Sequence, residues 1–361
     1  MDNVVDLDKI WEVIDSWFQP NILALSKAIN ATIKNGFFSQ ADVQHAVRAI
    51  RQKLDKKVLS NWIKQARPYN SEIDIKTDHP KEVLCLHAGN LPMVGFQDVL
   101  ALLLSSNRYY GKISRKDPYL LPAFLEHLQK NGLMKQAQWS TQLSGLEIKN
   151  AKADAVLFSG AEENLPDVQD KLKALKLVDS STEYLNRTAH FSIAYIHDDY
   201  PKTFKDLTEA VFRYGGMGCR SVAVVVAPFS FNEIKCQFTD YIEAFWLKNP
   251  QHAKPEPELR YQMAYNKAIE RPHAWLDHFL IQEGGLEPEK PFTLYWVEGS
   301  LEDTQSIAEE YSDALQNIYV TRPDIFISGF EDRIDWLHNA QKPAINWKPD
   351  GMDTLRWLSG L

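Results

Sequence analysis

Residues 82–118 read EVLCLHAGNLPMVGFQDVLALLLSSNRYYGKISRKDP, and this stretch decides the fold class. Residues 82–86 form a short apolar run that ends in a Gly-Asn-Leu-Pro loop, a pattern typical of a buried strand followed by a turn. A helix is expected over 94–106 and a second strand over 108–114. Asp117 and Pro118 then begin another helix, because an aspartate cap followed by proline favours a helix N-terminus. Two strands joined by a helix predict parallel pairing.

The same alternation continues through the chain. A helix is expected after most strand candidates, including one over 306–315. Alternating strands and helices predict a mostly parallel sheet that helices cover on both faces, so the fold class is α/β. The further strand candidates are 153–160, 191–196, 221–228, 293–297 and 324–328.

The N-terminal part differs, because its apolar residues recur at helical spacing and it contains no strand candidate. Gly36 is expected to end one helix and Ser39 to cap the next. The charged, proline-containing residues 252–260 indicate a surface loop. The predicted organisation is a helical segment at 1–70, an α/β domain at 71–197, a second α/β domain at 198–345, and a C-terminal segment at 346–361 that returns to the first domain or forms a dimer interface.

Composition excludes several classes of function. The 361 residues carry 40 Lys and Arg against 48 Asp and Glu, a net charge of −8, which disfavours a nucleic-acid or anionic-membrane partner. Three cysteines without C-x-x-C spacing and ten histidines without a ligand motif predict neither disulfides nor a metal site. The N-terminus does not resemble a signal peptide, and no apolar run is long enough to span a bilayer. We therefore expect a soluble, cytoplasmic protein.

The segment Gly215-Gly216-Met217-Gly218-Cys219-Arg220 is a glycine-rich turn ahead of a strongly β-branched strand candidate. Glycines let a ligand approach the backbone closely, and a cysteine beside an arginine can have a lowered pKa. Cys219 is therefore a candidate nucleophile. The other interpretation is a tight helix-to-strand connection in which the cysteine only packs. Cys85, inside an apolar strand, and Cys236, in mid-helix, are interpreted as structural residues.

Two polar segments follow the first pair of strand candidates, where parallel sheets bind ligands. Asn90 lies in the Gly-Asn-Leu-Pro loop, as a ligand-binding amide or as a turn former. The second segment suits a phosphate or ribose, or is a solvated loop. Its polar residues are Lys112, Ser114, Arg115 and Lys116.

Ser159 and Gly160 form a third candidate segment, between a buried strand and a helix. The free N–H groups at the start of that helix could hold a pyrophosphate. The segment has too few glycines for a G-x-G-x-x-G fingerprint, so the signal is weak by itself.

Together and in this order, these segments resemble the LuxC-type acyl-CoA reductases, the fatty-acid reductase component of bacterial bioluminescence, which belong to the aldehyde dehydrogenase superfamily. The resemblance runs from residues 87–118 through 154–163 to 214–226, and more loosely to 351–358. It implies two Rossmann-like three-layer domains, one for the cofactor and one for catalysis, after the helical N-terminal segment.

The resemblance also implies a role for each candidate residue. Cys219 matches the nucleophile that attacks the acyl carbonyl. The Asn90 amide matches an oxyanion-hole donor that acts with the Cys219 backbone N–H. The contact to the adenosine ribose or its 2′-phosphate is matched by Lys112 with Ser114 nearby, and the pyrophosphate turn by Ser159 with Gly160.

The implied activity is NADPH-dependent reduction of a fatty-acyl thioester, carried by coenzyme A or an acyl carrier, to an aldehyde. Positive charge at Lys112, Arg115 and Lys116 favours NADPH. Aromatic residues around Phe204, Phe212 and Phe245 suggest a medium or long acyl chain. A protein that supplies the acyl group, and a homodimer or higher oligomer, are the expected partners.

Two alternatives to acyl reduction remain. The water-activating glutamate stretch of oxidising aldehyde dehydrogenases is missing from residues 180–192, which favours reduction, but Glu183 lies in that region. Oxidation of aldehydes, with Glu183 or another carboxylate as the base, is therefore the first alternative. The second is a nucleotide-binding subunit of a complex that has lost catalysis.

Overall fold

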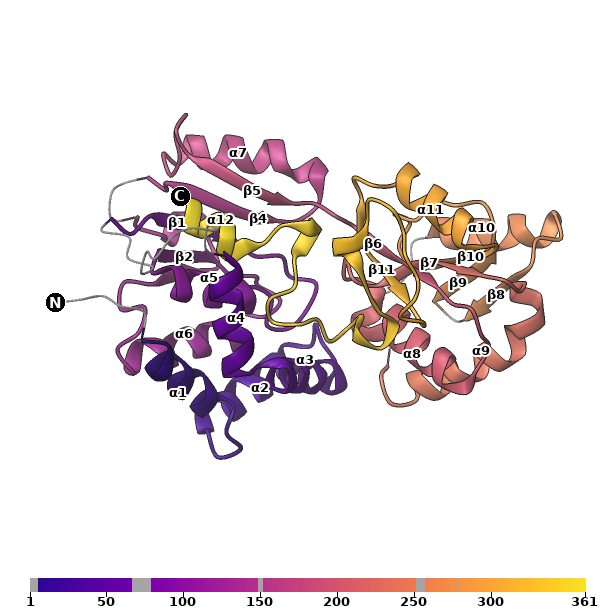
Figure 1. The fold of residues 1–361 in the computed structure, drawn as a ribbon, viewed down its shortest axis with the longest axis horizontal. Helices are drawn as coiled ribbons and strands as arrows, with labels where there is room; N and C mark the ends of the chain where they lie inside the picture. The colour runs from indigo at the N-terminus through magenta and orange to yellow at the C-terminus, as the bar shows by residue number, and fades with distance from the viewer. Residues whose placement is uncertain (1–5, 67–78, 149–151, 251–256, 277) are drawn as a thin grey trace. The chain divides into compact units, whose positions relative to one another are not determined.

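The computed structural model describes residues 6–66, 79–148, 152–250, 257–276 and 278–361 (Figure 1). The chain folds into two compact units. The first unit comprises Met1–Thr188 and Ala344–Leu361, and the second comprises Ala189–Pro343. None of the helices in the described ranges is both long and apolar enough to cross a membrane.

The first unit contains a parallel sheet with the strand order β3-β2-β1-β4-β5. The central strand β1 is fully buried, as its apolar sequence predicts. Residues Leu86 of β1 and Lys112 of β2 are paired, so the loops that follow these two strands leave the same edge of the sheet. The strands are β1 (Glu82–Leu86), β2 (Arg108–Lys112), β3 (Gln138–Ser140), β4 (Ala155–Ser159) and β5 (Glu183–Arg187).

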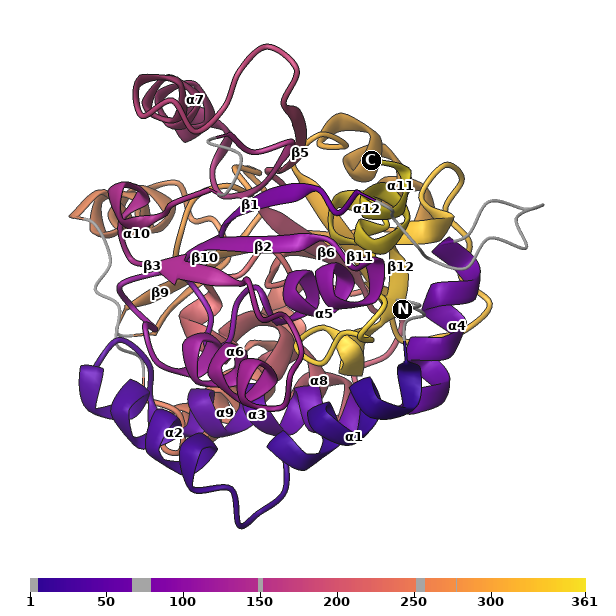
Figure 2. The ribbon, with the colours of Figure 1, turned by 90° about the vertical axis from the view of Figure 1, so that its left-hand side faces the viewer.

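Helices cover both faces of this sheet (Figures 1 and 2). Helices α5 (Phe96–Ser105) and α6 (Leu120–Lys130) pack in one apolar cluster on one face. Helix α7 (Leu165–Ala174) packs in a second cluster on the opposite face, with the fully buried Leu172 as its contact. This is the three-layer arrangement that the alternation of strands and helices predicts.

The N-terminal helices add a further layer to the α5 and α6 side, because their apolar faces join the same cluster. Gly36 ends α2 in the left-handed conformation, and the Ser39 hydroxyl accepts the Asp42 N–H at the start of α3, so both predicted helix ends are confirmed. The predicted segment ends at 70, but residues 67–78 lie outside the described residues. The helices are α1 (Leu7–Trp17), α2 (Leu23–Asn35), α3 (Gln40–Lys53) and α4 (Lys56–Ala66).

The second unit contains a mixed sheet with the order β12-β11-β6-β7-β10-β9-β8, in which only β8 is antiparallel to its neighbour among the described residues. Its strands are β6 (Phe191–Tyr195), β7 (Val222–Ala227), β8 (His273–Leu276), β9 (Phe279–Glu283), β10 (Thr293–Glu298), β11 (Leu315–Val320) and β12 (Ile334–Trp336). Its helices are α8 (Pro201–Phe212), α9 (Phe231–Trp246), α10 (Pro257–Ala268) and α11 (Leu301–Glu310).

Several elements differ from the sequence prediction. Strand β6 is hydrogen-bonded to β7 and β11, so the chain passes to the second unit at Thr188 and not at 197. Residues 324–328, predicted as a strand, are irregular, and β11 begins at Leu315, the last residue of the predicted helix over 306–315. Strands β3, β5, β8, β9, β11 and β12 were not predicted. Within the predicted loop at 252–260, residues 251–256 lie outside the described residues and α10 begins at Pro257.

The C-terminal segment returns to the first unit, one of the two placements that were expected. Helix α12 (Thr354–Gly360) packs against α4 and α5. The Trp62 indole donates to the Asp353 carboxylate at 3.0 Å, and the Gln97 amide donates to the Ile345 carbonyl at 3.0 Å.

Gly95, directly before α5, has a φ of +92°, and a Cβ at this position would overlap the buried His87 ring. We expect Gly95→Ala to destabilise the first unit by about 2–4 kcal/mol, because a left-handed alanine and a steric overlap add together. Gly36→Ala is the matched control, since Gly36 has a similar φ of +83° but no atom near the added Cβ. Its cost should be only about 1 kcal/mol. Urea unfolding of both variants tests this, and equal losses would contradict it.

Candidate functional site

Cys219 lies in a turn whose backbone is fixed by left-handed residues. Tyr214, Gly215 and Gly216 have φ values of 58°, 70° and 72°. Gly216 also leaves little room, because a Cβ there would lie 3.0 Å from the Val211 carbonyl oxygen. The glycine-rich sequence therefore reflects backbone geometry, and it places Cys219 just before β7, an inner strand of the second sheet.

The three cysteines differ in exposure. Cys85 is fully buried in β1, as predicted for a structural residue, and burial raises the pKa of its thiol well above the ordinary value. Cys236 is in α9, as predicted, but it is exposed and so is not a core residue. Cys219 is half-buried. A half-buried thiol on a rigid turn is what a positioned nucleophile requires.

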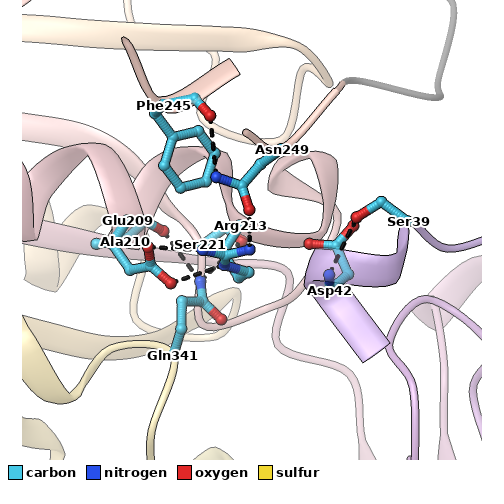
Figure 3. Close-up of polar contacts among 9 residues, drawn as sticks. All are labelled: Ser39, Asp42, Glu209, Ala210, Arg213, Ser221, Phe245, Asn249 and Gln341. Carbon is cyan, nitrogen blue, oxygen red and sulfur yellow. Dashed lines mark hydrogen bonds and ion pairs between the residues drawn. The ribbon is translucent and has the colours of Figure 1, made fainter. Parts of the chain in front are cut away.

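Hydrogen bonds hold the turn at Cys219 itself and at the residues on either side of it. The Ser192 hydroxyl, buried on β6, donates to the Cys219 carbonyl at 3.0 Å. The Ser221 N–H donates to the Gly218 carbonyl at 2.8 Å, which closes the turn. The buried Gln341 amide in turn donates to the Ser221 hydroxyl at 3.3 Å and to the Ala210 carbonyl at 3.0 Å (Figure 3).

Arg213 holds the turn from its beginning (Figure 3). Its side chain is 6% exposed and donates to both oxygens of Glu209, at 2.7 and 2.8 Å. The guanidinium also donates to the Asn249 side chain and lies over the Phe245 ring, 4.9 Å from its centroid. Contacts at both ends of the turn restrict where the Cys219 thiol can lie, and no pattern in the sequence predicts these contacts.

The aromatic residues suggested for an acyl pocket are mostly part of the core. Phe204 and Phe212 are 0% and 2% exposed. Phe204 packs against Phe238 with ring centroids 5.5 Å apart, and Phe212 packs against Phe279 at 4.7 Å. Their apolar character reflects helix packing, so that interpretation of these two residues is wrong. Phe245 is partly buried under Arg213.

In the first unit, the candidate residues meet at one edge of the sheet. After β1 the chain enters α5 on one face, and after the neighbouring β4 it enters α7 on the other face. Such a reversal between adjacent parallel strands opens a crevice at their carboxyl ends, where α/β sheets bind ligands. The loop with Asn90 follows β1, and Ser159 and Gly160 lie at the end of β4, so the two segments flank this point.

The Asn90 loop is anchored by buried polar contacts. The Met93 N–H donates to the Asp117 carboxylate at 3.0 Å, and Asp117 also accepts the Thr32 hydroxyl of α2 at 2.8 Å. A Cβ at Gly89 would overlap the Ser114 hydroxyl, so this loop and the one after β2 touch. Asn90 and Ser114 are thereby placed in adjoining loops.

A buried charged network lies beneath the same loop. Asp98 of α5 accepts Arg187 Nη1 at 2.7 Å, and its other oxygen lies 3.5 Å from His87 Nδ1. Arg187 also donates to the Thr354 hydroxyl of α12 at 2.8 Å. His87 Nε2 lies 2.9 Å from the Tyr109 hydroxyl, so His87 is a buried histidine with partners on both ring nitrogens. No pattern in the sequence predicts the contacts of Asp98, Arg187 and Thr354.

Lys112 is half-buried at the end of β2. Burial, with the positive charges of Arg115 and Lys171, lowers the pKa of Lys112. An anion bound beside Lys112 would offset this unfavourable effect on its charged form. Arg115 and Lys116 are exposed, and Asn35 of α2 donates to both of their carbonyls, at 3.3 and 3.0 Å.

These residues fit a phosphate-bearing ligand such as a dinucleotide. Lys112 and Arg115 supply positive charge at the edge of the sheet, and the Gly160 turn leads into the N-terminal end of a helical segment. Glu162 and Glu163 are exposed at the start of that segment, and their negative charge opposes a phosphate. The electrostatic attraction for a phosphate must therefore come from the side of the site that carries Lys112. Among the described residues, no group of three or more His, Cys, Asp or Glu side chains is placed to hold a metal ion.

Glu183 lies at the opposite edge of the same sheet. It is the first residue of β5, it is exposed, and it pairs with Ala155 at the start of β4. Asn90 and Ser159 lie at the carboxyl edge, roughly 13 Å away for a strand of this length. Glu183 is therefore not a member of the cluster that contains Asn90.

Both units match one class of fold. The chain has an aldehyde dehydrogenase-like fold, with a parallel sheet in the first unit and a mixed sheet in the second. No protein-family model and no curated protein sequence matches it. The likeness is one of structure, at low sequence identity.

Three solved structures illustrate it. Aldehyde dehydrogenase 21 from Physcomitrella patens, in complex with the reaction product succinate, matches with a TM-score of 0.60 and 11% identity, over 90% of this chain and 74% of that one. Lactaldehyde dehydrogenase from Escherichia coli matches with a TM-score of 0.57 and 15% identity, over 88% and 73%. An oxidoreductase from Marinobacter aquaeolei matches with a TM-score of 0.61 and 12% identity, over 92% and 76%.

Proposed function

We propose that this protein is an oxidoreductase that reduces a fatty-acyl thioester to an aldehyde through an acyl-enzyme on Cys219, with NADPH as the cofactor. The observation that carries the proposal is the Cys219 turn. Within an aldehyde dehydrogenase-like fold, a half-buried thiol sits on a backbone clamped on both sides, while the other two cysteines are fully buried or lie on an outer helix.

Cys219 holds the acyl group during the proposed reaction. Its thiolate attacks the acyl carbonyl carbon and forms a new C–S bond. The C–S bond to the carrier then breaks, and the carrier leaves as a thiolate that takes up a proton. NADPH, when bound, supplies the hydride that reduces the thioester carbon. The C–S bond to Cys219 then breaks, which releases the aldehyde and restores the thiolate.

We assign Asn90 the role of a hydrogen-bond donor to the acyl oxygen as negative charge develops on it. Asn90→Ala should slow acyl-enzyme formation by about 10²–10³-fold, the usual effect of removing one oxyanion-hole donor. The thermal unfolding midpoint should change little. Intact mass, read against time after mixing with an acyl-CoA, measures the rate. Asn131→Ala, at the surface end of α6, is the control, and equal rates in the two variants would remove Asn90 from the mechanism.

The position of Glu183 supports reduction over hydrolysis. A base that activated water beside the acyl-enzyme would turn the thioester into an acid before reduction. Glu183 lies at the other edge of the sheet from Asn90, so the pair does not form one site within the first unit. Oxidation of an aldehyde with Glu183 as the base is therefore the weaker proposal.

The preference for NADPH is supported by the cations at Lys112, Arg115 and Lys116, which offer charge for a 2′-phosphate. We further propose a medium- or long-chain acyl group on coenzyme A or an acyl carrier, a protein partner that supplies it, a homodimer or higher oligomer, and a cytoplasmic location. These proposals rest on the resemblance to acyl-CoA reductases.

The test uses purified wild-type protein and a long-chain acyl-CoA. Intact mass should show one acyl adduct, and addition of NADPH should remove the adduct while the absorbance of reduced nicotinamide falls. Oxidation of the aldehyde without an adduct from acyl-CoA would favour the dehydrogenase alternative. Binding of NADPH without any adduct, from acyl-CoA or acyl carrier, would favour a non-catalytic nucleotide-binding subunit.

A further inference from the structure

Lys171 of α7 lies on the same side of the first sheet as Lys112. Side chains alternate between the two faces of a strand, so Tyr110 and Lys112 of β2 point to one face. Tyr110 packs in the apolar cluster that also contains Leu172 of α7. Helix α7 covers this face of the sheet (Figure 2). The strand alternation therefore predicts that the Lys112 side chain is directed to the α7 side.

The α7 helix presents Lys171 beside this buried contact. Leu172 is fully buried, and Val168 and Leu165 are partly buried against the same cluster, so these residues form the inward stripe. Lys171 flanks the stripe and is exposed. Helical side chains lean toward the N-terminus of their helix, and the N-terminus of α7 follows the carboxyl edge of the sheet. Helix geometry therefore predicts that the Lys171 side chain leans back toward the edge with Lys112.

The pKa of Lys112 agrees with this placement. Burial lowers it first, and the charges of Arg115 and Lys171 lower it further. Lys173, two residues later, instead forms an exposed ion pair with Asp170, with 3.6 Å between Nζ and Oδ1. Of these two neighbouring lysines on α7, Lys171 is the one that contributes to the lowered pKa of Lys112.

We propose that Lys171 is a specificity-determining residue that, together with Lys112 and Arg115, binds the 2′-phosphate of the cofactor's adenosine ribose. This inference rests on the proposed function, because it assumes that the carboxyl edge of the first sheet binds a nicotinamide dinucleotide. A dianionic phosphate among three cations relieves their mutual repulsion, whereas the 2′-hydroxyl of NADH does not. Lys112 would contact the phosphate from strand β2, and Lys171 would contact it from helix α7.

The experiment compares Lys171→Gln with Lys173→Gln, both of which keep a long polar side chain on an exposed helix face. Calorimetric titration with 2′,5′-ADP and with 5′-AMP isolates the 2′-phosphate, and titration with NADPH and NADH repeats the comparison with whole cofactors. We expect Lys171→Gln to weaken 2′,5′-ADP and NADPH binding by roughly 5- to 10-fold, the scale of one exposed charge-assisted contact. Binding of 5′-AMP and NADH should be unchanged, and Lys173→Gln should match the wild type in every titration.

Lys171→Arg keeps the charge and should restore most of the affinity for 2′,5′-ADP. Equal losses in the Lys171 and Lys173 variants would show only a general field effect and would overturn the assignment. So would an equal loss of NADH and NADPH binding by Lys171→Gln. A wild-type protein that binds none of the four nucleotides would instead defeat the proposed function itself, which separates the two failures.

Discussion

Cys219→Ala should give no covalent acyl adduct with a long-chain acyl-CoA and no NADPH consumption beyond the background rate. Removing a covalent nucleophile removes the reaction path and not one contact, so turnover should fall on the order of 10⁶-fold and below detection. The variant should fold, because the turn is fixed by its glycines and by contacts to backbone and neighbouring side chains. NADPH binding should be retained, since the candidate cofactor residues are in the first unit.

Cys236→Ala is the control for unspecific acylation. Cys236 is the exposed cysteine and is therefore open to direct transfer from an acyl-CoA in solution. If the adduct forms on Cys219, this variant keeps both the adduct and the NADPH-dependent turnover. Loss of the adduct in Cys236→Ala with its survival in Cys219→Ala would place the reactive thiol on α9 and refute the mechanism.

Cys219→Ala also distinguishes the alternative functions, because each of them predicts a different set of activities for this variant and the wild type. A dehydrogenase that works through Cys219 in the oxidative direction would lose aldehyde-dependent NADP⁺ reduction in Cys219→Ala. A non-catalytic subunit would show neither reaction in the wild type, and the substitution would leave its nucleotide binding intact. The three functions therefore predict different patterns over the same pair of proteins.

Local pattern was enough to predict the three inner strands of the first sheet, β2, β1 and β4, but not its edge strands β3 and β5. Strand β1, helix α5 and strand β2 follow one another with short connections, and their apolar period identifies each element. The elements that the sequence missed depend on distant partners. Residues 324–328 contain an apolar run, and Ile327 is 1% exposed, but Phe326 is 62% exposed and the segment does not join the sheet. Strand β11 forms next to it because its residues pair with β6, more than a hundred residues earlier.

The candidate site divides in the same way. Cys219, Asn90, Lys112 and Ser159 stand at glycine-rich or polar turns after or before strands, and such turns are visible in a sequence. Lys171 could not be predicted, because one exposed lysine among several on a charged helix has no distinguishing pattern. The proposed role of Lys171 is inferred from the face of β2 on which Lys112 lies and from the packing of Leu172, and both require the structure. Asp98, which belongs to an apolar helix sequence, pairs with a residue 89 positions away.

Asp98→Asn should destabilise the first unit by about 3–5 kcal/mol, the cost of leaving one member of a buried ion pair without its partner. Asp98 and Arg187 are 4% and 9% exposed, so water cannot replace the lost charge. The network also ties β1, α5, β5 and α12 together beneath the Asn90 loop. Urea unfolding at neutral pH, followed by tryptophan fluorescence, gives the change in unfolding free energy.

Two further variants test separately how much burial and how much charge pairing contribute to the loss in Asp98→Asn. Asp179→Asn removes another carboxylate whose pKa is lowered by hydrogen bonds from Ser181 and Lys152, but this group lies on the surface and its loss should have little effect. Adding Arg187→Gln to Asp98→Asn should recover part of the loss, because neither charge is then buried alone. Losses that simply add in the double variant would show that the two residues are not coupled.

Low pH should lower the unfolding free energy of the wild-type protein through protonation of Asp98. Burial raises the pKa of Asp98, but Arg187 and His87 lower it by more, to about 2, below the ordinary value of about 4. The unfolded chain therefore binds a proton on Asp98 at a higher pH than the folded chain does, and stability falls as the pH falls from about 4 to about 2. Asp98→Asn lacks this proton, so its unfolding free energy should change less steeply with pH in that window. Parallel slopes for the two proteins would mean that folding does not lower the pKa of Asp98, and would contradict stabilisation of its charge by Arg187.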